Sequence, residues 1–289
     1  MIDKPIVVLY HGKCPDGFAA AYAAWKKFGD SAEYIPVSYG DSPPNGLENR
    51  EVYIVDFCYE SSEQMDLLAK STKRLVVLDH HESNKKMVEN VTEHVYDASR
   101  SGATIAWNYF HPKSPVPRLM TYLEDGDLYR YSLPETRNIF SYLLVLPFDF
   151  VQWDKFAYNL ENDTERIEIL KKAEAYTEFF NAFAQMSVER AKKVRFEGYE
   201  VYFVATHPNI TVKSYVANEL YTKLPPFAIV ATAHPNGFGV SLRGNESVDV
   251  SKIAKKYGGG GHPGSAGFFV PNGSEMPWVE IPENEDSGN

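Results

Sequence analysis

Acidic and histidine side chains recur in four short segments of the first half of this 289-residue chain. The segments contain His11, Cys14 and Asp16; Asp56; Asp79, His80 and His81; and Glu124, Asp125 and Asp127. Two divalent cations about 3.5–4 Å apart need a carboxylate that bridges them, with further carboxylates and imidazoles around the pair. Such a pair activates water for attack on a phosphate ester. The four segments therefore predict a two-metal hydrolytic centre.

The types of these residues indicate which metals are favoured. Carboxylates and imidazoles without paired thiolates suit Mn²⁺ first and then Mg²⁺, with Zn²⁺, Fe²⁺ and Co²⁺ as weaker candidates. Each segment alone has an ordinary explanation, because an aspartate after a strand commonly caps a helix or a turn. Capping does not explain why acids and histidines recur at successive strand ends, so we favour the metal centre.

Strands and helices alternate around these segments. Apolar runs predict strands at residues 5–10, 51–55 and 74–78, and helical patterns occupy residues 18–28, 61–70, 101–110 and 118–124. This alternation predicts an α/β fold whose N-terminal domain has a parallel sheet with helices on both faces. Ligands bind such sheets at the carboxyl ends of the strands, where we expect the acidic residues, including an acidic turn at 124–127.

The second half of the chain predicts a smaller α/β domain with a mixed sheet. Residues 164–193 have the pattern of a long amphipathic connecting helix, and strand patterns follow at 199–205, 227–233 and 239–243. We place a metal-binding domain with the connecting helix at residues 1–190 and a substrate-binding domain at 191–271. Residues 272–289 carry five acidic and no basic residues, which predicts a disordered tail.

A glycine run in the second domain is a candidate phosphate or ribose cradle. The run and its neighbour are Gly259, Gly260, Gly261 and His262. Successive glycines let backbone N–H groups approach an anion closely, whereas the alternative is a flexible linker. Arg243 follows a strand of the same domain and suits either a substrate phosphate or a surface ion pair. Arg100 is a candidate for a second phosphate contact.

Composition limits the partners and the compartment. A net charge of −10 argues against a surface that grips long double-stranded nucleic acid, because such surfaces need clustered Lys and Arg. A small nucleotide or a short oligonucleotide remains a suitable substrate. No apolar run is long enough for a membrane span, and the two cysteines suit a reducing compartment. We expect a cytoplasmic protein without membrane contact, and a homodimer is compatible with the sequence.

The order of the motifs resembles the DHH phosphoesterase superfamily. Asp79-His80-His81 follows the strand RLVVL, Asp56 follows VYIV, and the turn CPDG follows IVVLY. The late GGGGH resembles the DHH-associated C-terminal domain, so that the resemblance covers the chain apart from its tail. Members of this superfamily include nanoRNases, RecJ-like exonucleases and cyclic dinucleotide phosphodiesterases.

The resemblance implies roles for the residues of all four segments. The implied metal ligands are Asp56 as the bridge, with His11, Asp16, His80 and Asp125, and Asp127 as the alternative to Asp125. Asp79 would orient its histidine neighbours, and His81 would face the substrate phosphate, so these two form the catalytic pair. Arg243 would hold a phosphate of the substrate.

Cys14 departs from the family pattern, whose first motif has two aspartates separated by one residue. Asp16 keeps the second place, and Cys14 takes the first. A thiolate can bind metal but is softer than a carboxylate, and it shifts the preference toward Zn²⁺ or Fe²⁺. Loss of one ligand, or a merely structural cysteine, are the alternatives.

The resemblance implies a metal-dependent phosphohydrolase that cleaves short oligonucleotides or cyclic or linear dinucleotides to 5′-mononucleotides by attack of a metal-activated water. A phosphomonoesterase acting on 3′-phosphorylated adenosine phosphate, or a polyphosphate or pyrophosphate hydrolase, would use the same metals. The alternative that is not an enzyme is a nucleotide sensor whose metal site has been degraded at Cys14.

Overall fold

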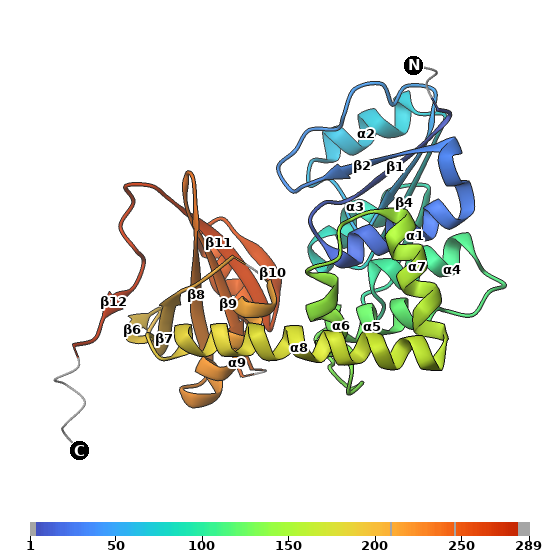
Figure 1. The fold of residues 1–289 in the computed structure, drawn as a ribbon. Helices are drawn as coiled ribbons and strands as arrows, with labels where there is room; N and C mark the ends of the chain where they lie inside the picture. Colours follow the sequence, from blue (N-terminus) through green and yellow to red (C-terminus); the bar gives the residue numbers. More distant parts are fainter. Residues whose placement is uncertain (1–3, 209, 246, 283–289) are drawn as a thin grey trace. The chain divides into compact units, whose positions relative to one another are not determined.

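The chain folds into two units. The computed structural model describes residues 4–208, 210–245 and 247–282. The first unit is Met1–Ala175 and the second is Tyr176–Asn289, and the division falls inside the long helix α8 (Asp163–Val188) (Figure 1). Within the described residues, no helix combines the length and the apolar character needed to cross a membrane.

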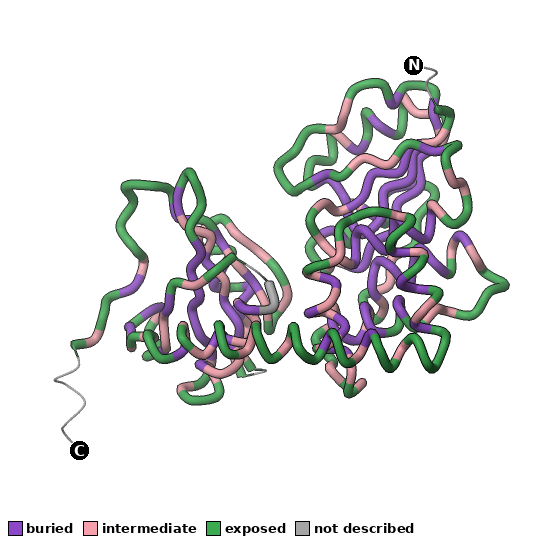
Figure 2. Tube along the Cα trace, in the orientation of Figure 1, coloured by how far each residue is buried: buried purple, intermediate pink, exposed green. Residues whose placement is uncertain are grey.

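The first unit is built on a parallel five-stranded sheet with the order β2-β1-β3-β4-β5. The strands are β1 (Ile6–His11), β2 (Ala32–Val37), β3 (Glu51–Val55), β4 (Arg74–Asp79) and β5 (Glu93–Tyr96). The apolar runs IVVLY, VYIV and LVVL form its three central strands. Because these runs are apolar at every position, both faces of the sheet are buried (Figure 2).

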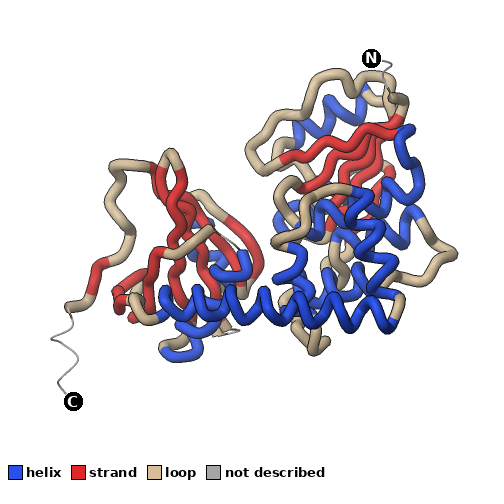
Figure 3. The backbone as a smooth tube through the Cα atoms, in the orientation of Figure 1, coloured by secondary structure: helices blue, strands red, loops and turns tan. Residues whose placement is uncertain are grey.

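Helices cover both faces of this sheet, as the sequence predicts (Figure 3). One face packs on α1 (Pro15–Phe28), α4 (Gly102–Phe110), α5 (Arg118–Asp127), α6 (Thr136–Leu143) and α7 (Phe150–Glu161). The other face packs on α2 (Ser62–Ser71) and α3 (Lys85–Glu89), and short 3₁₀ turns lie at Gly29–Ser31 and Glu82–Asn84. Val8 belongs to the first core and Val7 to the second, because alternate strand residues face opposite ways.

The second unit is built on a mixed seven-stranded sheet with the order β10-β11-β9-β8-β7-β6-β12, in which only β7 and β8 pair in parallel. Its strands are β6 (Lys192–Phe196), β7 (Tyr199–Ala205), β8 (Phe227–His234), β9 (Gly237–Gly244), β10 (Gly260–His262), β11 (Ser265–Pro271) and β12 (Val279–Glu280). Helix α9 (Ile210–Lys223) covers one face and α10 (Val250–Lys256) the other. The mixed sheet agrees with the prediction.

Two predicted features differ from the structure. Residues 124–127 form the last turn of α5, not an acidic turn after it. Residues 272–282 are not a disordered tail, because Trp278 is buried in the core of the second unit and β12 pairs with β6. The rest of the predicted tail, residues 283–289, lies outside the described residues.

Candidate metal centre

Three neighbouring strands deliver their residues to one edge of the first sheet. His11 is the last residue of β1, Asp56 follows β3, and Asp79 ends β4, with His80 directly after it. Parallel strands β1, β3 and β4 lie side by side, so that their carboxyl ends meet. The turn after β1 leads into α1, which adds Asp16 in its first turn.

Asp56 lies at the middle of the cluster. Its Oδ2 is 3.4 Å from Nδ1 of His11, and its Oδ1 is 3.2 Å from Nε2 of His80. Only 1% of Asp56 is exposed, and its backbone has a left-handed φ of 55°. Gly102 of α4 makes room for the carboxylate, because a Cβ on this glycine would lie 2.5 Å from Oδ1 of Asp56.

Asp127 completes the cluster from the last turn of α5. Its Oδ2 is 3.5 Å from Nε2 of His80, and one ligand atom each from Asp16, His80 and Asp127 lie within 4.8 Å of one another. Asp16 Oδ1 accepts a hydrogen bond from Ala103 N at 3.2 Å. Three carboxylates and two imidazoles from distant parts of the chain therefore meet in one buried place.

The donor atoms fit a divalent metal ion. Neither oxygen of Asp56, nor Oδ2 of Asp16, is hydrogen bonded by any residue that the structure describes. Burial raises the pKa of Asp16 well above its usual range, and the charges of Asp127 and Asp56 raise it further. Burial opposes protonation of His80, but its carboxylate neighbours prevail and raise its pKa to about 10. Cations in the cluster would relieve this repulsion and satisfy the buried oxygens.

A hydrogen-bonded chain holds His81 beside the cluster. Nδ1 of His81 donates to Asp79 Oδ1 at 2.7 Å, and the same oxygen accepts the backbone N–H of His80 at 2.8 Å. Asn84 donates to Asp79 Oδ2 at 2.8 Å and to the hydroxyl of Tyr39 at 3.0 Å. Asp79 is thus saturated by donors, which fixes the ring of His81 and assigns its proton to Nδ1.

Asp125, which the sequence preferred to Asp127 as a ligand, is not brought together with the other predicted ligands, because its carboxylate is held by other donors. Its Oδ1 accepts Ser132 N at 2.9 Å and Ser132 Oγ at 2.5 Å, while Oδ2 accepts Leu133 N at 3.1 Å and Thr136 Oγ1 at 2.5 Å. Residues two apart on a helix are rotated by about 200°, so Asp125 and Asp127 face opposite ways. Asp127 is the residue of this pair that reaches the cluster.

Cys14 lies beside the cluster as the N-cap residue of α1. It is half-buried, and one ligand atom each from His11, Cys14 and Asp56 lie within 4.8 Å of one another. Burial raises the pKa of the Cys14 thiol well above its usual range, and the charges of Asp56, Asp127 and Asp16 add to this effect. Its position beside His11 and Asp56, and not its pKa, places the cysteine to bind metal alongside these two residues.

Arg100 forms an ion pair with Glu124. Its Nε donates to Oε2 of Glu124 at 2.7 Å, and Arg130 approaches the same carboxylate at 3.5 Å. The side chain of Ser101 caps α4, as its sequence position suggests. A phosphate contact from Arg100 stays a prediction.

The candidate phosphate residues of the second unit share one face of its sheet. Arg243 pairs with Ser265 across β9 and β11, and Ser265 pairs with His262 across β11 and β10, so the three side chains project to the same side. Arg243 is only 8% exposed, and its Nη1 donates to Leu242 O at 3.0 Å.

The glycine run has steric reasons for two of its members. A Cβ on Gly259 would clash with Gly267 O, and one on Gly261, whose φ is +136°, would lie 2.6 Å from Ala266 Cα. Gly260 has open space where a Cβ would stand. The run therefore depends on glycine for close backbone packing, and whether it also binds phosphate stays a prediction.

Lys213 is a residue that the sequence did not single out. It lies in the first turn of α9, on the same stripe as Val216, Ala217 and Leu220, which are buried against the sheet. Burial lowers the pKa of Lys213, and the nearby charge of Arg243 lowers it further. Periodicity signals this residue, because a lysine interrupts an otherwise apolar helix face.

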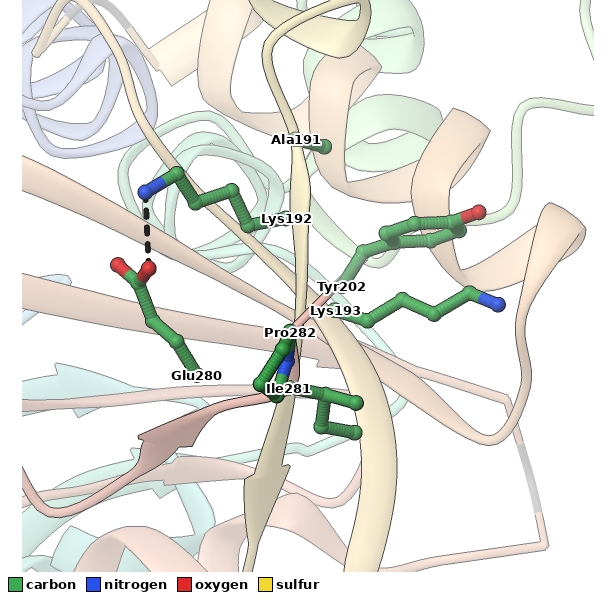
Figure 4. Close-up of a pocket in the computed structure, with 7 residues that line it drawn as sticks. All are labelled: Ala191, Lys192, Lys193, Tyr202, Glu280, Ile281 and Pro282. Carbon is green, nitrogen blue, oxygen red and sulfur yellow. Dashed lines mark hydrogen bonds and ion pairs between the residues drawn. The ribbon is translucent and has the colours of Figure 1, made fainter. Parts of the chain in front are cut away.

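The second unit also has a pocket of about 550 Å³, lined by Ala191, Lys192, Lys193, Tyr202, Glu280, Ile281 and Pro282 (Figure 4). Lys192 and Glu280 form an ion pair across it at 2.8 Å. The lining contains neither histidine nor aspartate, so this pocket is not a metal-site candidate.

Comparisons with known proteins agree with this architecture. Residues 201–282 match the DHHA1 domain. Over 293 residues the chain is 28% identical to Uncharacterized protein R106 of Acanthamoeba polyphaga mimivirus, with 92% of this chain and 68% of that protein covered. The similarity to R106 thus extends through both units.

Three solved structures share the fold. The DHH domain of a member of the s1p family of ribosomal proteins has a TM-score of 0.60 at 15% identity, over 92% of this chain and 83% of that one. A pGpG-specific phosphodiesterase from Vibrio cholerae has a TM-score of 0.52 at 14% identity, over 93% and 94% of the two chains. RecJ from Thermus thermophilus, in complex with Mn²⁺, has a TM-score of 0.50 at 14% identity, over 92% and 49%. The DHHA1 match in the second unit and the shared fold together confirm the resemblance of this chain to the DHH phosphoesterase superfamily.

Proposed function

We propose that the protein is a metal-dependent phosphoesterase that cleaves phosphodiester bonds of short oligonucleotides, or of linear or cyclic dinucleotides, and releases 5′-mononucleotides. The observation that carries this proposal is the position of Asp56. Its two carboxylate oxygens face different imidazoles, with His11 beside Oδ2 and His80 beside Oδ1. A buried carboxylate placed in this way suits a bridge between two cations.

The donor set supports two divalent cations, with Mn²⁺ preferred. Asp56, Asp16, Asp127 and His80 offer carboxylate oxygens and one imidazole, a combination that suits Mn²⁺ or Mg²⁺. RecJ from Thermus thermophilus, which shares the fold, is described as a complex with Mn²⁺. When bound, the cations would supply a nucleophilic water at neutral pH and neutralise charge on the phosphate.

His81 is assigned to the phosphate oxygens. Burial lowers its pKa, but the hydrogen bond to Asp79 and the charge of Asp56 outweigh this effect and raise it. A protonated His81 held by Asp79 donates through Nε2, on the side of the ring away from that aspartate. This donor would stabilise the negative charge that grows on phosphorus oxygens during in-line attack.

The second unit carries a candidate phosphate-binding surface of its own. Arg243 and Lys213 place two basic side chains on one face of the sheet. His262 lies two strands away from Arg243, in register with it through Ser265. A pair of basic side chains suits a phosphate, and the glycine run Gly259–Gly261 would add backbone contacts. The overall charge of −10 favours a short substrate over a long polyanion, and the fold is shared with a pGpG-specific phosphodiesterase.

The test is turnover by the full chain with Mn²⁺, on a panel of linear and cyclic dinucleotides, short RNA and DNA, 3′-phosphorylated adenosine phosphate and pyrophosphate. Asp56→Asn keeps the shape of the side chain but removes its charge, and should lower turnover by about a thousandfold or more, since several kcal/mol of charge stabilisation are lost. The exposed Asp66 of α2 provides the matched control, Asp66→Asn. Absence of metal-dependent hydrolysis across the panel, or full activity of Asp56→Asn, would refute the proposal.

A further inference from the structure

Asp56 separates two groups of potential ligands that differ in chemical hardness. On the Oδ2 side are the imidazole of His11 and the thiol of Cys14. On the Oδ1 side is His80, which lies with the carboxylates of Asp16 and Asp127 within 4.8 Å. Only the first group contains sulfur.

We propose that the centre is heterodinuclear, with Zn²⁺ on His11, Cys14 and Asp56, and Mn²⁺ on Asp16, Asp56, His80 and Asp127. This inference rests on the function proposed above. Zinc in catalytic sites is usually held by three protein ligands from Cys, His and carboxylates, with a fourth position left open, and the first group has this composition. Three carboxylates and one imidazole form a harder set, which suits Mn²⁺.

The neighbours of Cys14 support its assignment as a ligand. Its side chain does not cap α1, although the residue stands at the N-cap. Beside it, Nδ1 of His11 and Oδ2 of Asp56 are buried and receive no hydrogen bond from the described part of the chain. His11 Nδ1 and Asp56 Oδ2 lie 3.4 Å apart, and a thiol next to this imidazole and carboxylate fits three ligands around one thiophilic cation.

Cys58 is the only other cysteine of the chain and serves as the internal control. It is fully buried in the core between the sheet and α2, and its Sγ donates to Tyr59 O at 3.6 Å. Cys58 is in none of the groups that could hold a metal among the described residues. Its replacement by alanine should leave metal binding unchanged.

The experiment uses the metal-free full chain, one equivalent of Co²⁺ as a spectroscopic substitute for Zn²⁺, and separately Zn²⁺ with excess Mn²⁺. Wild type and Cys58→Ala should show a thiolate-to-Co²⁺ charge-transfer band, and both should retain one Zn²⁺ and one Mn²⁺ per chain after desalting, with the electron paramagnetic resonance signal of an uncoupled Mn²⁺. Cys14→Ser should lose the band and weaken Zn²⁺ binding by at least about tenfold, the loss that follows even from removing a residue that only supports a ligand. Cys14→Asp should bind two Mn²⁺ ions, with a coupled Mn²⁺ pair in the spectrum.

A missing thiolate band in the wild type, or the same Zn²⁺ retention in Cys14→Ser, would overturn the assignment. Circular dichroism and metal-free melting temperatures establish that each variant is folded. None of these readouts needs turnover. If a chain with two Mn²⁺ ions and no Zn²⁺ hydrolyses the substrates, the mixed-metal assignment fails and the proposed function stands. If the chain holds Zn²⁺ and Mn²⁺ but hydrolyses nothing, the assignment stands and the proposed function fails.

Discussion

Asp125 and Asp127 lie two residues apart on α5, yet their replacement should have opposite effects. Asp125→Ala removes the acceptor of four hydrogen bonds, from two backbone N–H groups and two hydroxyls. Asp127→Ala removes one of the three carboxylates of the candidate metal centre. We expect the first change to destabilise the fold and the second to remove metal binding.

The cost of Asp125→Ala follows from the donors left behind. A buried donor without its acceptor costs about 1–3 kcal/mol, and this cost applies to the backbone N–H of the half-buried Leu133. Ser132 is exposed, so its N–H can turn to water, and the hydroxyls can turn to other partners. Taking about 2 kcal/mol, and about 2–4 °C per kcal/mol for a domain of this size, the melting temperature should fall by about 4–8 °C. Metal-free Asp127→Ala should melt at the wild-type temperature or above it.

The effect of Asp125→Ala should depend on pH in a defined direction. Burial opposes ionisation of Asp125, but its hydrogen bonds with Ser132 and Thr136 prevail, and the pKa is lowered. A carboxylate whose pKa is lower in the folded state contributes stability above its unfolded pKa of about 3.9, and loses it as the pH falls through the folded value. The gap between wild type and variant should be full at neutral pH and shrink below about pH 4.

The measurements are urea unfolding and thermal melting of both variants, with and without Mn²⁺. Wild type and Asp125→Ala should be stabilised by Mn²⁺, because a ligand of the native state raises its stability by mass action, and Asp127→Ala should not. Equal destabilisation of the two metal-free variants, or Mn²⁺ stabilisation of Asp127→Ala alone, would refute these assignments.

Two further substitutions test the surroundings of the two sites. Gly102→Ala places a methyl group 2.5 Å from Asp56, so it should destabilise the metal-free chain by about 1–3 kcal/mol and reduce Mn²⁺ binding, measured by unfolding and by calorimetry; wild-type values for both would contradict the packing described here. Lys213→Met should raise KM by about tenfold with little change in kcat, because it would remove the charged contact proposed for the substrate, while Lys223→Met at the far end of α9 should change neither value; equal kinetics of the two variants would exclude Lys213 from substrate binding.

The ends of the central strands could be predicted from sequence because local pattern and topology agree there. The apolar runs before His11, Asp56 and Asp79 define strands, and parallel neighbours present their carboxyl ends at the same edge. The order of the motifs then indicated which residues follow those strands. The sequence alone was therefore enough to predict that the three segments meet in one place, without knowledge of side-chain packing.

The choice between Asp125 and Asp127 could not be made from sequence, because it depends on packing against a distant helix. The run EDGD has the composition of a turn, yet Gly126 continues α5, and a Cβ there would clash with the ring of Phe140 on α6. Glycine is therefore present for helix packing and not for a turn. Trp278 is a similar case. Its neighbours are polar and acidic, which predicts disorder, but its own side chain packs into the core of the second unit.

Selection for folding stability alone would not favour an aspartate at position 56. The residue has a left-handed backbone, which costs a non-glycine residue on the order of 1–3 kcal/mol, and its charge raises the pKa of the neighbouring buried Asp16. The folded chain holds this strain without a cation, and the proposed metal binding would offset it. Metal supply would then govern how long the protein persists as well as how fast it works, and starvation for metal should expose it to unfolding and proteolysis.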